Sequence, residues 1–156
     1  MTATARHGRD GLQGYNCGMF PSEALDRIAR QFGVDLILQF GSTVGGRLHA
    51  RSDVDVGVRF AGDVPSLSTV AELQQELQRL VPDREVDLAI INRADPLFLY
   101  QMVSRCALLH GSPRRLAELK MYAFRRYQDH RRFLALERRY VRALGERVIA
   151  PSTAHG

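Results

Sequence analysis

Apolar residues recur along the chain at two spacings, one typical of helices and the other typical of strands. The three- and four-residue spacing predicts helices over residues 22–32, 66–80, 95–106 and 113–148. Short apolar runs predict strands over residues 34–40, 53–60 and 85–92. A further short apolar run, residues 107–111, is the last segment of the core. Because helices and strands alternate with connections of mixed length, the pattern predicts an α+β fold, a small mixed β-sheet backed by helices. We expect those helices on one face of the sheet, which leaves the other face free for chemistry.

A single domain with two appended segments is the organisation that this pattern predicts. Residues 1–19 are polar, rich in glycine and without periodicity, so we expect a flexible N-terminal extension. Residues 20–112 form the expected core, and residues 113–148 form a long C-terminal helical arm of the same domain. The first half of this arm carries an apolar stripe that can pack on the core. The second half lies too far along a straight helix for so small a core to cover, so we expect a partner chain or a second copy to contact it.

Two aspartates stand inside a run of valines. Asp53 and Asp55 alternate with apolar residues in the strand over 53–60, so both carboxylates lie on one face of it. Two carboxylates at this spacing can bind a divalent cation together, and Asp87, alone in the apolar strand over 85–92, can complete an oxygen-rich site suited to magnesium. Two such ions can hold the attacking and leaving oxygens of a phosphoryl displacement. The alternative, that these acids are surface residues of an edge strand and a turn, accounts less well for three acids in apolar runs.

Ten residues separate a glycine–serine pair from the first of these acids. Gly41 lets the backbone approach a ligand closely, and the Ser42 hydroxyl with nearby backbone N–H groups can hold a triphosphate tail. Ser42 can also cap the turn that follows, which is compatible with phosphate binding because both roles use the same amides. The intervening loop holds three residues that can reach phosphate or simply face solvent: Arg47, His49 and Arg51.

Together these features resemble the signature of the DNA polymerase beta-like nucleotidyltransferase superfamily. The stretch FGSTVGGRLHARSDVDVGV matches its glycine–serine turn and acid pair, and EVDLAIINRADPLFLYQMVSRCALLHG matches the strand with the third acid and the helix after it. Residues 34–111 resemble the minimal nucleotidyltransferase (MNT) proteins. The stretch FRRYQDHRRF is similar to the terminal helix of MntA-type antitoxins from HEPN/MNT toxin–antitoxin pairs. The resemblance covers most of the chain after residue 20 and implies a polymerase beta-like core.

The resemblance also implies an activity. It is the Mg²⁺-dependent transfer of AMP from ATP onto a tyrosine of a HEPN ribonuclease toxin, which silences the toxin. By position, Asp53 and Asp55 would hold two Mg²⁺ ions and contact the nucleotide. Asp87 would bind the metal at the nucleophile and help to deprotonate the incoming hydroxyl. Gly41 and Ser42 would hold the β- and γ-phosphates. The three aspartates are thus the expected catalytic and metal-binding residues.

Composition and charge limit the class of protein, its location and its possible partners. The chain has 156 residues, of which 45% are hydrophobic and 25% charged, as in a globular protein. No apolar run is long enough to cross a bilayer and no secretory signal is evident, so we expect a cytoplasmic protein without membrane contact. Cys17 and Cys106 offer neither a disulfide framework nor a zinc site. Residues 113–147 hold eleven basic residues and four acids, which suits nucleic acid, an acidic protein or a solvated helix face.

The length of the chain helps to choose among acceptors. A nucleotidyltransferase that acts on a free small molecule or on RNA needs structure to hold that acceptor, and only one helical arm follows the core. We therefore expect the acceptor to be another folded protein. Two alternatives stay open: a small-molecule, aminoglycoside-like nucleotidyltransferase, which could be a homo-oligomer, and a non-catalytic antitoxin that acts by binding alone. RNA ranks lower as an acceptor, because we find no surface of interleaved aromatic residues among the arginines.

Overall fold

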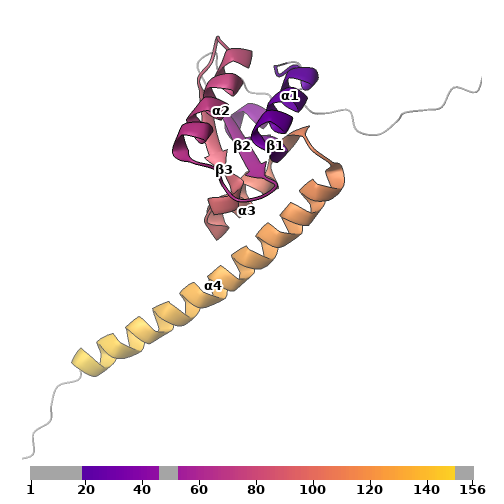
Figure 1. The fold of residues 1–156 in the computed structure, drawn as a ribbon. Coiled ribbons are helices and arrows are strands. Elements are labelled where there is room, and N and C mark those ends of the chain that lie inside the picture. Colours follow the sequence, from indigo (N-terminus) through magenta and orange to yellow (C-terminus); the bar gives the residue numbers. More distant parts are fainter. Residues whose placement is uncertain (1–18, 46–52, 150–156) are drawn as a thin grey trace, which may run out of the picture.

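The computed structural model describes residues 19–45 and 53–149 of the chain. It confirms an α+β fold with one mixed sheet and a long C-terminal helix (Figure 1). In chain order the elements are α1 (Ser22–Phe32), β1 (Val34–Phe40), η1 (Gly41–Gly45), β2 (Val54–Phe60), α2 (Leu67–Leu80), β3 (Val86–Ile90), η2 (Ile91–Arg93), α3 (Pro96–Ser104), β4 (Cys106–His110) and α4 (Pro113–Ile149). The elements η1 and η2 are short 3-10 helices.

The sheet has four strands in the order β3-β2-β1-β4. The pairs β1–β2 and β1–β4 are antiparallel, and the pair β2–β3 is parallel. The sequence pattern does not predict β4, because its five residues do not alternate between apolar and polar positions and form a strand only by pairing with β1. The helix predicted over 95–106 therefore ends at Ser104, and Cys106 pairs with Phe40 instead.

Local side-chain contacts set where several elements begin and end. Asp95 Oδ1 accepts hydrogen bonds from the backbone N–H groups of Leu97 and Phe98, each at 3.0 Å, and so caps α3. The strand predicted over 85–92 ends at Ile90. Beyond it, the Asn92 amide accepts from the Phe60 N–H at 2.9 Å and donates to the Phe60 carbonyl at 3.1 Å. This side chain replaces the next backbone pairing between β2 and β3.

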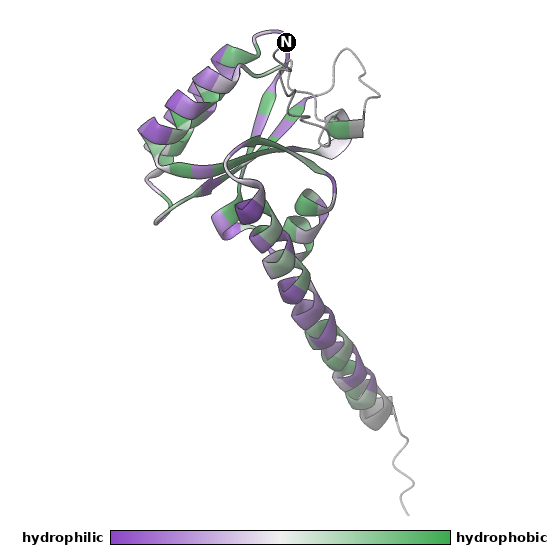
Figure 2. Ribbon diagram, turned by 90° about the vertical axis from the view of Figure 1, so that its right-hand side faces the viewer, coloured by the Kyte–Doolittle hydropathy of each residue, from purple (hydrophilic) through white to green (hydrophobic). Residues whose placement is uncertain are grey.

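Helices cover both faces of the sheet. The helices α1 and α2 pack on the face that carries the valines of β2, around Ile28, Leu73 and Leu77. The helix α3 and the first turns of α4 pack on the opposite face, where Met102 and Leu119 are buried. Figure 2 shows apolar strands between these helices. The expectation of helices on one face only is therefore wrong, because α3 and the first turns of α4 pack together on the second face.

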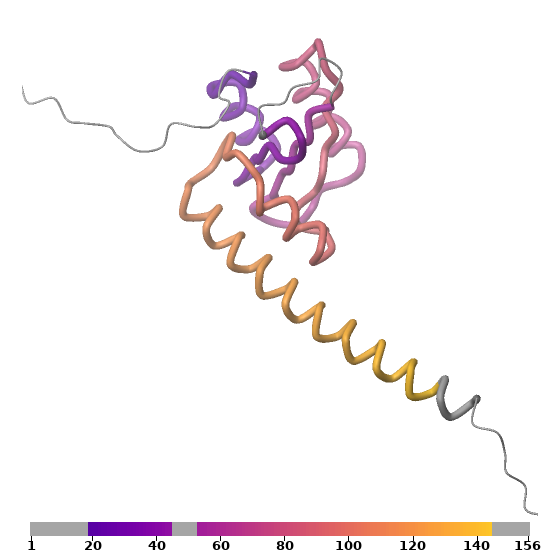
Figure 3. The backbone as a smooth tube through the Cα atoms, turned by 180° about the vertical axis from the view of Figure 1, so that it is seen from behind, coloured from indigo at the N-terminus to yellow at the C-terminus, as the bar shows by residue number. Residues whose placement is uncertain are grey.

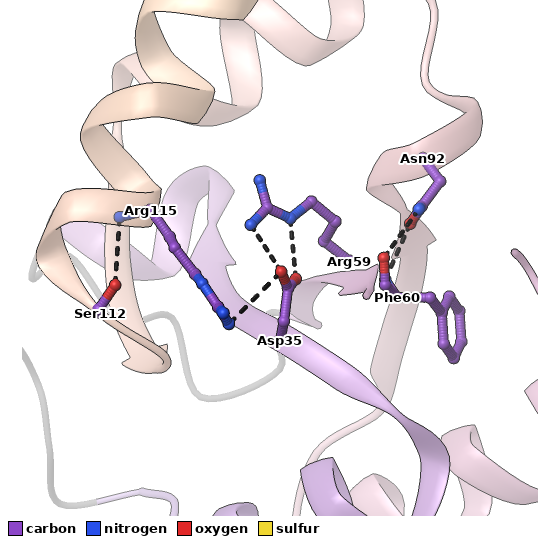
Figure 4. A network of polar contacts seen from close by, with 6 residues as sticks. All are labelled: Asp35, Arg59, Phe60, Asn92, Ser112 and Arg115. Atoms are coloured by element: carbon purple, nitrogen blue, oxygen red, sulfur yellow. Dashed lines mark hydrogen bonds and ion pairs between the residues drawn. The ribbon is translucent and has the colours of Figure 1, made fainter. Parts of the chain in front are cut away.

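A cluster of charged residues ties the start of α4 to the sheet (Figure 4). Arg59 on β2 donates from Nε and Nη2 to the two carboxylate oxygens of Asp35 on β1, each at 2.8 Å. Arg115, in the first turn of α4, lies 3.6 Å from the same carboxylate. Further along, the ring of Tyr127 on α4 stacks on that of Tyr100 on α3, with centroids 4.4 Å apart. The first half of α4 is therefore fixed to the core at several points.

The outer arm, defined here as residues 133–144, extends away from the core (Figure 3). Leu134 is the last described side chain of α4 that is not exposed. The helix has 37 residues and is about 55 Å long at 1.5 Å per residue, so the core covers only part of it. Among the described helices, none combines the length and apolar character that crossing a bilayer requires.

Several large apolar side chains of the outer arm face solvent. They are Phe133, Leu136, Tyr140, Val141 and Leu144. Two of them are aromatic and stand among arginines, so the premise that no aromatic residues are interleaved with the arginines is wrong. An apolar stripe of this size on a charged helix is typical of a surface that another chain covers.

Candidate active site

The three predicted acids lie together at one end of the sheet. Asp55 on β2 pairs with Asp87 on the parallel strand β3, so these residues are neighbours. Asp53 precedes Asp55 by two residues and therefore lies on the same side of its strand. Asp53 and Asp87 are exposed, and Asp55 is half-buried. The structure thus brings the carboxylates of Asp53, Asp55 and Asp87 to one edge of the sheet that the helices leave uncovered, and we call these three residues the acid edge.

The pairing of the strands continues this end of the sheet toward β4. Phe40 on β1 pairs with Asp55 on one side and with Cys106 on the other. One row across the sheet therefore reads Asp87, Asp55, Phe40 and Cys106. Gly41 follows Phe40 and Arg105 precedes Cys106, so Gly41 lies between the acids of β2 and β3 and the basic residue before β4.

Gly41 is in direct contact with the acid site. Its φ is +77°, in the left-handed region that residues with a Cβ rarely adopt. A Cβ added at Gly41 would lie 2.1 Å from Asp55 Oδ2, well inside van der Waals contact. Glycine is therefore required both by the backbone conformation and by the position of the Asp55 carboxylate.

A buried glutamine holds the turn that follows Gly41. Gln39 is 1% exposed, and its Nε2 donates to Thr43 Oγ1 at 3.1 Å. The Thr43 hydroxyl in turn donates to the Phe40 carbonyl at 3.4 Å. Gln39 Oε1 has no hydrogen-bond partner among the described residues. These two polar side chains fix η1, and with it Gly41 and Ser42, against the sheet; sequence patterning does not predict them, because an isolated glutamine in a strand carries no motif.

The environment of Asp55 disfavours its charged form. Burial raises the pKa of the Asp55 carboxyl above its ordinary value, and the negative charges of Asp87 and Asp53 raise that pKa further, while a backbone hydrogen bond opposes the shift. The three carboxylates therefore interact electrostatically, as expected for acids that share one edge.

This donor set fits a hard divalent cation. Mg²⁺ takes oxygen ligands, and a cation placed among these carboxylates would offset the repulsion that raises the pKa of Asp55. Within residues 19–45 and 53–149, no three Asp, Glu, His or Cys side chains form a closed metal-binding group. The three acids therefore lie near one another, and their charges interact, but their carboxylates do not converge on one point.

A pocket of about 350 Å³ opens beside Gly41 on the side away from the acids. Its lining residues are Gly41, Ser42, Val44, Ser104, Arg105, Cys106 and Lys120. Burial raises the pKa of the Cys106 thiol, and the positive charge of Lys120 opposes that rise. Within the described part of the chain, neither Arg105 nor Lys120 has a carboxylate within 4.0 Å.

No motif in the sequence marks Arg105 or Lys120 as a site residue. In the sequence, both residues contribute only to the general charge of the chain. A signal was nonetheless present in the composition: of the 22 basic residues, 21 are arginine and Lys120 is the single lysine.

A second pocket, of about 420 Å³, lies toward the opposite end of β2. Its polar lining includes Arg59, Asn92 and Glu118. Arg59 is already paired with Asp35, and Asn92 is hydrogen bonded to the Phe60 backbone, so these groups have structural partners. The acid edge is the stronger candidate for chemistry, because its charges are not compensated within the described residues.

Parts of the predicted site fall outside the described residues. The loop residues Arg47, His49 and Arg51 belong to this group, and so do residues 1–18 of the predicted N-terminal extension. The five candidate residues Gly41, Ser42, Asp53, Asp55 and Asp87 all lie within the described ranges.

Comparison with known families identifies the core. Residues 23–115, more than half of the chain, match the model of the polymerase beta nucleotidyltransferase family. The match includes all five candidate site residues and ends shortly after α4 begins. A comparison with curated protein sequences found no relative.

Several solved structures with the same fold come from toxin–antitoxin complexes. A chain of a toxin–antitoxin complex with AMP-PNP is 26% identical, with a TM-score of 0.62, and the match covers 84% of this chain and 100% of that one. A chain of an MntA–HpeT complex carrying a tyrosine-to-alanine mutation is also 26% identical, with a TM-score of 0.61 and coverage of 84% and 99%. A chain from the Shewanella oneidensis complex of a tri-AMPylated HEPN toxin with its MNT antitoxin is 25% identical, with a TM-score of 0.56 and coverage of 83% and 96%.

Proposed function

The chain belongs to the polymerase beta nucleotidyltransferase family, and on this basis we propose that it transfers AMP from ATP to a tyrosine hydroxyl of a HEPN-domain toxin, as the antitoxin of that toxin. The observation that carries the proposal is the acid edge, where Asp55 and Asp87 pair across adjacent strands beside Gly41. Similarity to an MNT antitoxin in complex with an AMPylated HEPN toxin supports the choice of acceptor. The proposal places the reaction in the cytoplasm, where ATP is available.

Each site residue has a role in this proposal that follows from its position. Asp53, Asp55 and Asp87 would hold Mg²⁺, which when bound neutralises charge on the phosphates that react. Asp87 is exposed at the edge of the sheet, and the proposal gives its carboxylate the further role of accepting a proton from an incoming hydroxyl. Gly41 and Ser42 line the floor beside these acids and would contact the phosphate chain. The exposed location of the edge suits an acceptor carried on another folded protein.

The outer arm provides a surface for that protein. It exposes Phe133, Leu136 and Tyr140, and the core of this chain does not cover them. We assign this surface to the HEPN-domain partner, because a chain that brings its own tyrosine to the acid edge must be held near it. The 113–148 segment would then be the partner-binding part of the domain.

The test is to co-express the chain with a HEPN-domain protein encoded beside it and to measure the intact mass of that partner. The expected result is a mass increase of one or more AMP units with the unchanged chain, and none with the Asp53→Ala, Asp55→Ala double variant. The matched control is Asp63→Ala, Asp83→Ala, which removes two exposed carboxylates outside the acid edge and should leave the modification intact.

Two results would contradict the proposal. A partner that stays unmodified while it binds tightly would favour a non-catalytic antitoxin that acts by binding alone. A modified partner in the presence of the double variant would show that the acids of β2 do not carry the chemistry.

A further inference from the structure

The single lysine of the chain lies in the pocket beside the acid edge. The other 21 basic residues are arginine, so arginine serves at every other position where this protein carries a permanent positive charge. Lysine differs from arginine in that its ammonium is a compact point charge on a flexible stem, and as such a point charge it can bind phosphate oxygens. The single lysine therefore brings a compact, mobile positive charge to this pocket.

The backbone at Lys120 is held firmly although its side chain is exposed. The preceding residue, Leu119, is 4% exposed and packs in the core between α3, α4 and the sheet. One turn earlier, Arg115 forms the ion pair with Asp35 on β1. Arg105, the second cation of the pocket, is placed by the pairing of Cys106 with Phe40. Two independent elements therefore bring one positive charge each to the same pocket.

The charges at this end of the sheet are segregated. The acids stand on β2 and β3, the cations stand before β4 and on α4, and Gly41 lies between them. The strands β2 and β4 are two positions apart, which corresponds to about 10 Å. A ligand that contacts both sides must be extended and anionic, and it must bind through a metal ion on the acid side, because carboxylates repel phosphate. A chain of phosphates meets these requirements.

We propose that Arg105 and Lys120 bind the β- and γ-phosphates of the nucleoside triphosphate, with Gly41 and Ser42 as the floor of this pocket. This inference rests on the proposed function and adds two cationic residues to it; the α-phosphate would lie at the acids and the pyrophosphate unit toward β4. In the transfer, the acceptor oxygen forms a bond to the α-phosphorus, and the bond from that phosphorus to the α,β-bridging oxygen breaks. Pyrophosphate leaves with the electron pair and gains the charge that Arg105 and Lys120 stabilise, while the hydroxyl proton passes to Asp87.

The composition of the chain allows a direct test. Reductive methylation modifies primary amines, and Lys120 is the only side chain that carries one, so the terminal amine of the same chain serves as an internal control. The reaction is followed by peptide mass mapping on the full chain in the presence of Mg²⁺. We expect ATP and inorganic tripolyphosphate to slow methylation of Lys120 by about tenfold or more, with no change at the terminal amine. We expect AMP, which lacks the β- and γ-phosphates, to give no protection.

Affinity measurements on variants supply a second readout. We expect Lys120→Gln and Arg105→Gln each to weaken ATP binding about tenfold in calorimetry, and to leave AMP binding unchanged. Lys120→Arg keeps the charge and should lose less. The matched control is Arg125→Gln, which removes an exposed positive charge from the same helix outside the pocket and should bind ATP as the unchanged chain does.

The outcomes separate this inference from the proposed function. Protection by tripolyphosphate together with an unmodified partner would keep the phosphate pocket and reject the transfer to a HEPN protein. The Lys120→Gln, Arg105→Gln double variant could instead modify the partner equally well and bind ATP with unchanged affinity. That result would reject phosphate binding by these two residues and leave the proposed AMP transfer standing. Protection by the protein partner alone, with none by ATP or tripolyphosphate, would also overturn the inference and assign the two cations to an acidic protein surface.

Discussion

At the scale of single residues, the acid edge depends on two requirements that meet at Gly41. Its backbone is in the left-handed region, and its Cα lies against the carboxylate of Asp55. The backbone of Gly41, which carries no side chain, therefore lies directly beside the acids. This arrangement explains why a glycine follows the last residue of β1 and why the acids of β2 can approach this backbone.

Substitution of Gly41 separates these two requirements when it is compared with a second glycine. Gly33 has a similar φ of +68°, but a Cβ added there would meet nothing within 4 Å. We expect Gly33→Ala to cost about 1–2 kcal/mol of unfolding free energy from backbone strain alone. Gly41→Ala should cost more and should abolish nucleotide transfer, because its Cβ displaces the Asp55 carboxylate. Chemical denaturation and the partner-mass assay test this, and equal effects of the two changes would contradict it.

The raised pKa of Asp55 predicts a dependence of stability on pH. Because the carboxyl has a higher pKa in the folded chain than its ordinary value of 3.8, the folded state holds the proton more tightly than the unfolded state does. Ionisation of Asp55 therefore lowers stability as the pH rises from about 3.8 through the folded pKa. With a chelator present, Asp55→Asn should be more stable than the unchanged chain at pH 7, and the difference should vanish toward low pH.

Thermal unfolding across this pH range measures the effect. Asp83→Asn is the control for loss of one negative charge, since Asp83 is an exposed turn residue away from the acid edge. A difference between Asp55→Asn and the unchanged chain that does not vary with pH would exclude carboxylate repulsion as its cause. Addition of Mg²⁺ should reverse the order at pH 7, because only the unchanged chain keeps all three acids.

At the scale of elements, one carboxylate joins two strands to the long helix. Asp35 on β1 accepts both bonds from Arg59 on β2 and lies 3.6 Å from Arg115 on α4. The Asp35 side chain is 14% exposed, so these contacts are only weakly screened by water. This cluster sets the start of α4 and, through it, the position of Lys120.

Removal of the Asp35 charge should weaken the attachment of α4 to the sheet. We expect Asp35→Asn to lower the free energy of unfolding by about 1–3 kcal/mol, because the partly buried Arg59 guanidinium loses its charged partner. Glu118→Gln breaks the exposed pair with Arg114 on the same helix and should cost no more than about 0.5 kcal/mol. Urea denaturation measures the free energy of unfolding of both variants. Equal losses would mean that the Asp35 cluster stabilises the chain no more than an ordinary surface ion pair does.

At the scale of the whole molecule, a compact core carries a helix longer than itself. The first half of α4 belongs to the core through Leu119 and Ala123, which are buried against α3 and the sheet. The outer arm keeps its apolar side chains in solvent. We propose that another chain covers this surface, and removal of the arm should then affect assembly rather than folding.

A double change in the outer arm tests this division. We expect Phe133→Ser, Tyr140→Ser to change the unfolding free energy of the isolated chain by less than about 0.5 kcal/mol, because both side chains are more than 60% exposed. The same change should prevent co-purification with the HEPN-domain partner. Arg132→Ser, Arg139→Ser, at the neighbouring exposed positions, is the matched control for the loss of long side chains. A complex that survives the aromatic change would place the partner elsewhere.

The sequence by itself determined the features that depend on local order along the chain. The alternation in β2 puts Asp53 and Asp55 on one face whatever the rest of the fold does, because successive strand residues point to opposite sides. The spacing of apolar residues likewise predicts α2, α4 and β1 close to their observed bounds.

Only the tertiary structure decided which elements meet. The strand β4 forms because Cys106 pairs with Phe40, and no local signal specifies that pairing. The second helical layer forms because α4 folds back along α3, which corrects the expectation of one open face. The same folding brings Arg105 and Lys120 to Gly41, and contacts between residues so distant in sequence depend on packing and strand order, which the periodicity of single segments does not encode.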